Sequence, residues 1–181
     1  MAQVSPQEIL DFWFSEQVEA HWFVRSDDLD TQIKQRFGDI YALAASGGLS
    51  EWKEDAPSTL ALIITLDQFP RNMFRGSPQA FATDALACDL SKYALDKGFD
   101  QNVDSKARQF FYLPLMHSEN VADQERCVKL YEGLGNDFAL GFAKEHRDIV
   151  KEFGRFPHRN TVLGRKHTPE ETEFLKTHSG F

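Results

Sequence analysis

The chain of 181 residues is poor in cysteine, in long apolar runs and in positive charge. Its two cysteines, Cys88 and Cys127, have no Cys-x-x-Cys spacing, so we interpret them as buried free thiols rather than a disulfide or a metal pair. No stretch approaches the ~18 apolar residues of a membrane span. The N-terminus has no basic-then-apolar signal pattern. These absences predict a cytoplasmic protein with no membrane partner.

The charge balance argues against another class of partner. The formal net charge is -8, whereas nucleic-acid binding depends largely on neutralising phosphates with Lys and Arg. The chain also lacks a P-loop, a Gly-x-Gly-x-x-Gly turn and a Gly-x-Ser-x-Gly nucleophile elbow. We therefore predict no nucleic-acid partner, and the sequence names no reaction.

Helix signals, by contrast, occur throughout the chain. Ser5-Pro6-Gln7-Glu8 and Thr168-Pro169-Glu170-Glu171 have the capping-box pattern with proline at the first helical position. The apolar run 60–66 is compatible with a buried strand, but no second strand candidate exists to pair with it, so we predict a central buried helix. About eight helices joined by short turns are expected, with antiparallel neighbours. No linker divides the chain, so residues 1–181 are predicted to form a single α-helical domain.

One short phrase occurs twice, as Phe69-Pro70-Arg71-Asn72 and as Phe156-Pro157-His158-Arg159-Asn160. Each copy follows an apolar segment, and we expect its proline to stop the preceding helix. Five of the ten arginines and none of the ten lysines lie in the two short segments 69–76 and 155–165, namely Arg71, Arg75, Arg155, Arg159 and Arg165. Arg suits bidentate contact with carboxylate or phosphate. The two copies are predicted to meet around one anionic ligand.

An internal role for the same arginines is the alternative. Each Arg would then pair with a carboxylate of the chain, and each Asn would cap a turn. Acids are available in neighbouring motifs at Asp67, Asp84, Glu119 and Asp123. Arginines that converge on an open pocket would favour a ligand, while arginines paired with Asp or Glu would favour a structural role.

Histidines supply further candidates for chemistry. Pro114 is expected to break a helix and to leave His117-Ser118-Glu119 at a helix junction, where His and Glu suit an acid-base pair or half of a metal site. The alternative is that Ser118 or Asn120 serves as a helix N-cap. His146 lies on a predicted apolar face and is interpreted as a core histidine. A metal site would need His117, His146 and His158 to converge, and no His-Glu-x-x-His spacing supports one. We predict no metal and no cofactor.

Four phrases of the sequence together resemble one family. They are Leu66-Asp67-Gln68-Phe69-Pro70-Arg71-Asn72, Ala80-Phe81-Ala82-Thr83-Asp84, Tyr112-Leu113-Pro114-Leu115-Met116-His117-Ser118-Glu119 and Gly154-Arg155-Phe156-Pro157-His158-Arg159-Asn160. The family is the mainly bacterial domain of unknown function number nine hundred and twenty-four. Phe12-Trp13-Phe14 also fits, so the resemblance covers nearly the whole chain. The resemblance implies a tetratricopeptide-like helical array and no known activity.

Two hypotheses of function follow. The first is a cytoplasmic helical protein that binds a small carboxylate- or phosphate-bearing ligand, with possible acid-base catalysis. Its ligand-binding residues would be Arg71, Asn72, Arg75, Arg159, Asn160 and Arg165. Its acid-base residues would be His117, Glu119 and His158. The second is a tetratricopeptide-like module that binds a peptide or protein partner on an acidic concave surface, with purely structural arginines. Both leave the oligomeric state open.

Overall fold

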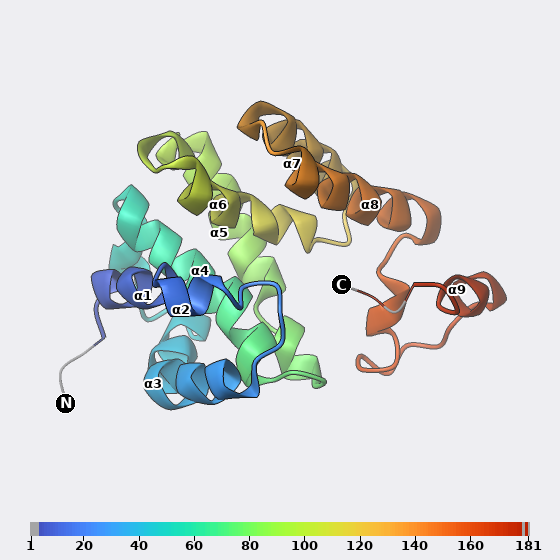
Figure 1. Cartoon of the computed structure of the whole chain (residues 1–181), viewed down its shortest axis with the longest axis horizontal. Coiled ribbons are helices and arrows are strands. Elements are labelled where there is room, and N and C mark those ends of the chain that lie inside the picture. The colour runs from blue at the N-terminus through green and yellow to red at the C-terminus, as the bar shows by residue number, and fades with distance from the viewer. Residues whose placement is uncertain (1–3, 179, 181) are drawn as a thin grey trace. The chain divides into compact units, whose positions relative to one another are not determined.

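The computed structural model describes residues 4–178 and residue 180 (Figure 1). Within this part of the chain there are nine α-helices, four short 3-10 helices and no strand, so the all-α prediction is confirmed. The α-helices are α1 Pro6–Trp13, α2 Glu16–Glu19, α3 Asp27–Ala45, α4 Ala56–Met73, α5 Asp84–Asp96, α6 Ser105–Met116, α7 Val121–Leu134, α8 Asp137–Phe153 and α9 Pro169–Phe174. The 3-10 helices are η1 Ser50–Lys53, η2 Pro78–Phe81, η3 Phe99–Asn102 and η4 Pro157–Arg159. The finer tetratricopeptide-like arrangement stays a prediction.

The described residues group into two compact units. Unit 1 contains those up to Arg75 together with Gln79–Pro114, and unit 2 contains Gly76–Pro78 and those from Leu115 onward. That residues 1–181 fold as a single domain stays a prediction.

Unit 1 is built around α4. All residues of this helix from Thr59 to Pro70 are buried, and α1, α3 and α5 pack against it. Phe69 is fully buried, with its ring 5.0 Å from that of Phe37 and 5.8 Å from that of Trp13. A helix that is apolar all round has to lie inside the fold. The prediction of a central buried helix from the run 60–66 is therefore confirmed.

Pro70 does not stop α4, and the prediction that it would is wrong. The helix continues through Pro70 to Met73, so Arg71 and Asn72 lie on its last turn rather than in a loop. Proline has no N–H to donate to the carbonyl four residues earlier. That carbonyl, on Leu66, instead accepts a hydrogen bond of 2.5 Å from the Thr83 hydroxyl. A side chain distant in sequence thus satisfies the group that proline leaves open.

The other two prolines also behave differently from the prediction. Pro114 lies inside α6, which ends two residues later at Met116. Before the second phrase, α8 ends at Phe153, where Gly154 adopts a left-handed conformation with φ of 70°. Glycine takes this conformation without a steric penalty. Gly154 therefore ends that helix, and Pro157 starts η4.

In unit 2, α7 and α8 lie side by side (Figure 1). Gly135 ends α7 with φ of 71°, and the Asn136 side chain caps α8. The predicted apolar face of α8 is only partly buried, because Phe138 is 78% and Phe142 41% exposed while His146 is buried. Helical periodicity identifies residues on one face, but it does not show how far along the helix that face is covered.

Several local predictions are confirmed. Thr168 and Glu171 form the predicted reciprocal capping box at α9. At α1 half of the predicted box is present, since the Ser5 hydroxyl accepts from the Glu8 amide while the Glu8 carboxylate lies 3.8 Å from Arg36. Cys88 and Cys127 are both buried and are not joined in a disulfide. Within the described residues, no helix is both long enough and apolar enough to cross a membrane.

Candidate functional site

Arg71 is occupied by carboxylates of unit 1. Its guanidinium makes a bidentate pair with Asp84, with nitrogen–oxygen distances of 2.8 and 3.0 Å. The same group donates to the Asp67 carbonyl oxygen at 2.6 Å and lies 3.4 Å from the Asp67 carboxylate. Because Asp67 is only 1% exposed, Arg71 neutralises a buried negative charge, to which the Gln68 amide also donates. The pair also ties the end of α4 to the start of α5.

Asn72 and Arg75 contact a different carboxylate of unit 1, that of Asp30. The Asn72 amide and two Arg75 nitrogens each donate to it at 2.8 Å. Burial raises the pKa of Asp30, but the hydrogen bonds from Arg75 and Asn72 outweigh that effect and lower it. The three residues border a hollow of about 290 Å³, in which Asp30 occupies the position that an anionic ligand would need.

In unit 2, Glu119 and Arg165 hold the backbone of Phe156. Arg165 donates to both Glu119 carboxylate oxygens at 2.7 and 2.9 Å. Glu119 also accepts from the Phe156 amide at 2.8 Å, while Arg165 donates to the Phe156 carbonyl at 3.1 Å. Burial opposes ionisation, but these hydrogen bonds lower the pKa of Glu119. Two predicted site residues thus bind both polar backbone groups of a fully buried phenylalanine.

The Glu171 carboxylate accepts hydrogen bonds from several polar groups that come before α9 in the sequence. Arg155 donates to its two carboxylate oxygens at 2.6 and 2.8 Å, and Asn160 donates at 3.1 Å. The Thr168 amide adds a bond of 2.8 Å. The Arg155 hydrogen bond is the main cause that lowers the pKa of Glu171 to about 2. Asn160, predicted to bind ligand, is fully buried in this network.

Histidines and Arg159 surround the Phe156 ring. The Arg159 guanidinium lies 4.5 Å from the ring centroid, and the side chain is 7% exposed. The rings of His146 and His158 lie 5.5 and 5.6 Å away. Burial is the main cause that lowers the pKa of His158 to about 4, and Arg159 contributes further. The surroundings of His158 are therefore poor in water and rich in positive charge.

His146 is a core histidine, as predicted. Its Nδ1 lies 2.8 Å from the Phe142 carbonyl oxygen, and burial is the main cause that lowers its pKa to about 3. His117 and His158 both lie near enough to lower that pKa further. Across residues 4–178 and residue 180, no group of three or more His, Cys, Asp or Glu side chains is arranged to hold a metal ion.

The nine predicted site residues fall into two sets. Arg71, Asn72 and Arg75 belong to unit 1, and the rest belong to unit 2, namely His117, Glu119, His158, Arg159, Asn160 and Arg165. The single shared site stays a prediction. Four arginines in or beside the two phrases make bidentate pairs with carboxylates of their own unit, namely Arg71, Arg75, Arg155 and Arg165. By the criterion set from the sequence, these pairs favour the structural role.

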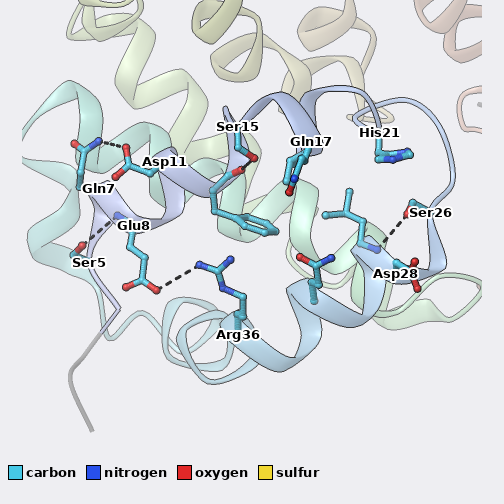
Figure 2. Close-up of a pocket in the computed structure, with 14 residues that line it drawn as sticks. Ser5, Gln7, Glu8, Asp11, Ser15, Gln17, His21, Ser26, Asp28 and Arg36 are labelled. Carbon is cyan, nitrogen blue, oxygen red and sulfur yellow. Dashed lines mark hydrogen bonds and ion pairs between the residues drawn. The ribbon is translucent and has the colours of Figure 1, made fainter.

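Unit 1 also contains a groove that was not predicted from the sequence; it lies among α1, α2 and α3 and has a volume of about 660 Å³. Figure 2 shows Ser5 and Glu8 at one end and His21 and Ser26 at the other. Its lining is mostly polar and comprises Ser5, Gln7, Glu8, Asp11, Phe12, Ser15, Gln17, Val18, His21, Ser26, Asp28, Leu29, Gln32 and Arg36. The sequence carries no signal for it, because polar residues on exposed helix faces are ordinary.

The groove is acidic. Glu8, Asp11 and Asp28 contribute negative charge, whereas Arg36 lies 3.8 Å from Glu8. The side chains of Gln17, Asp28 and Gln32 make no hydrogen bond or ion pair with any other described residue. Their polar groups face the groove with their hydrogen-bonding capacity available to a partner.

Together, the fold and these contacts define an all-α protein whose signature motifs tie its helices together. The chain belongs to the family described as "Bacterial protein of unknown function (DUF924)", whose model matches residues 9–179. It is also similar in structure to the protein of unknown function ATU0120 from Agrobacterium tumefaciens. That comparison has a TM-score of 0.91 and 44% sequence identity, over 96% of this chain and 97% of the other. No curated protein matches the chain at a significant level.

Proposed function

We propose that this protein is a helical binding module acting in the cytoplasm, and that the acidic groove of unit 1 binds a positively charged polypeptide segment. The observation that carries the proposal is the groove's lining, which has three carboxylates and one Arg. Gln7 donates to Asp11 there, whereas the side chains of Gln17, Asp28 and Gln32 have no partner among the described residues. This is the tetratricopeptide-like binding role predicted as the alternative from the sequence. Under it, the paired arginines are structural.

The chemistry of the lining favours a polypeptide over a small metabolite. Small-molecule sites are lined predominantly by apolar and aromatic side chains. Of the fourteen residues that line this groove, three are apolar, namely Phe12, Val18 and Leu29. Amide side chains both donate and accept hydrogen bonds, which suits a peptide backbone. Carboxylates around the groove attract Lys and Arg, and repel acidic segments.

A charge placed in the groove should weaken binding. Gln32→Lys adds a positive charge to the lining, and Lys and Gln have similar helix propensities, so the fold should tolerate it. Peptides selected on the wild-type chain from a displayed random library should be rich in Lys and Arg. We expect Gln32→Lys to raise their Kd roughly tenfold or more, measured by fluorescence anisotropy, because like charges then lie close together.

Gln35→Lys is the matched control, because Gln35 is an exposed residue of the same helix outside the groove lining. It makes the same change of charge and should leave the Kd within about twofold of the wild-type value. Equal weakening by both variants, or a selection that yields no basic peptides, would contradict the proposal.

We propose a small-anion site in unit 2 as the second candidate, with Arg159, Asn160 and Arg165 around the anion and His158 as the acid-base group beside His117 and Glu119. The observation that favours it is that the His158 ring and the Arg159 guanidinium lie 5.6 and 4.5 Å from the centre of one ring, that of Phe156. Burial first, and Arg159 next, lower the pKa of His158 to about 4, and Glu119 opposes this. An anion bound there would reduce the repulsion between Arg159 and a protonated His158. Arg165 already pairs with Glu119 at 2.7 Å, which counts against Arg165 as an unoccupied anion-binding group.

Inorganic phosphate tests this second candidate. An anion favours the imidazolium form, so saturating phosphate should raise the pKa of His158 by a unit or more toward about 6.5. Histidine resonances followed by NMR across the pH range give the value directly. The resonances of the exposed His21 in unit 1 serve as the internal control, because phosphate should hardly perturb them. An unchanged His158 pKa in phosphate would remove the candidate.

A further inference from the structure

The loop between α2 and α3 exposes two neighbouring apolar side chains. Phe23 is 70% and Val24 is 62% exposed. His21 and Ser26, which stand two residues before and two residues after this pair, both line the groove of unit 1 and are labelled at one end of it in Figure 2. Phe23 and Val24, which we call the lip, thus belong to the loop that borders that end of the groove.

The loop is held by Trp22, whose indole nitrogen donates to the Trp13 carbonyl oxygen at 2.9 Å. The Trp22 ring packs 4.7 Å from the Phe110 ring and 5.5 Å from the Phe14 ring. Trp22 thus supplies the aromatic contact between this loop and the core. Phe23 touches Trp22 at a centroid distance of 6.4 Å, yet most of its surface remains in water.

From these features we infer that the partner segment carries a large apolar side chain next to its positive charges, and that the lip binds this side chain. The inference rests on the proposed function of the groove. Scattered exposed apolar residues are common on protein surfaces. Here, however, two adjoin each other on a held loop at the end of a cleft, and an apolar side chain laid on them would remove both from water.

Charge complementarity decides in favour of a basic partner. The three groove carboxylates select Lys or Arg, and the chain itself carries a net charge of -8. A second acidic copy would place like charges together in the groove. The groove would therefore bind the positive charge of the segment, and the lip would bind an adjacent Leu, Ile, Phe or Trp side chain.

The test compares the peptides selected by the wild-type chain with those selected by the double variant Phe23→Ser, Val24→Ser. Wild-type selection from a displayed random library should enrich large apolar residues beside Lys or Arg, whereas the double variant should enrich Lys and Arg alone. A synthetic wild-type-selected peptide should bind the double variant roughly tenfold more weakly, since apolar contact area is lost. Phe138→Ser, at a 78% exposed phenylalanine of unit 2, is the matched control and should bind normally.

The outcomes separate the two proposals. Equal apolar enrichment on wild type and double variant would overturn the role of the lip while leaving the basic preference of the groove in place. No basic enrichment on the wild type relative to Gln32→Lys would overturn the proposed function itself. Light scattering would detect self-association of the wild type. If the double variant abolished it, the lip would bind a second copy of the chain, and this would also overturn the inference.

Discussion

Arg71→Met should lower the free energy of unfolding by about 3–5 kcal/mol, the usual cost of leaving a buried carboxylate without its partner. The variant removes the bidentate contact to Asp84 and the positive charge 3.4 Å from Asp67, which is 1% exposed. Methionine keeps much of the apolar stem, so the loss comes mainly from the charge. All three tryptophans, Trp13, Trp22 and Trp52, belong to unit 1. Urea unfolding followed by tryptophan fluorescence therefore reports on the unit that contains Arg71.

Arg25→Met is the control for this prediction. Arg25 pairs with Asp27 at 2.9 Å, but the two side chains are 70% and 77% exposed, and such surface pairs contribute about 0–1 kcal/mol. Its loss should hardly change the unfolding midpoint. A stable or more stable Arg71→Met protein would show that Arg71 belongs to a site that tolerates the loss of positive charge, and would favour the ligand hypothesis.

Acidification from about pH 7.5 to about pH 4.5 should remove about 3 kcal/mol of stability through His146 alone. Burial is the main cause that lowers the pKa of His146 from 6.5 to about 3. Between these two values His146 is protonated in the unfolded chain but stays neutral in the folded chain. The contribution is complete above the unfolded pKa and is lost as the pH falls toward the folded value. His158, with a pKa of about 4, adds to the same loss.

Above pH 4.5 the change of stability with pH comes mainly from the histidines rather than from the carboxylates. The pKa of Glu171 falls from 4.5 to about 2, mainly because Arg155 donates to it, so its contribution is lost only at more acidic pH. His146→Asn keeps a side-chain donor that can reach the Phe142 carbonyl and removes the titrating group. Urea unfolding followed by far-ultraviolet circular dichroism should therefore be less dependent on pH in this variant. An unchanged slope would contradict the role of His146.

Local sequence signals predicted the helices well but the action of proline poorly. The capping box at Thr168 and Glu171 involves residues three apart, so its contacts are written in the sequence itself. Pro70 is different, because α4 continues through it with the Leu66 carbonyl bonded to Thr83, seventeen residues further on. Whether a proline ends a helix thus depends on a partner that local pattern does not reveal.

The sequence by itself determined the all-α class, the buried nature of α4 and the capped starts of α1 and α9, because hydrophobic periodicity and capping act over three or four residues. It also identified the arginines that matter. Only the tertiary structure decided what they bind, since Arg71 meets Asp84 across 13 residues and Arg165 meets Glu119 across 46. The acidic groove was likewise decided there, because polar residues from separate helices form a cleft only when packing brings their exposed faces together.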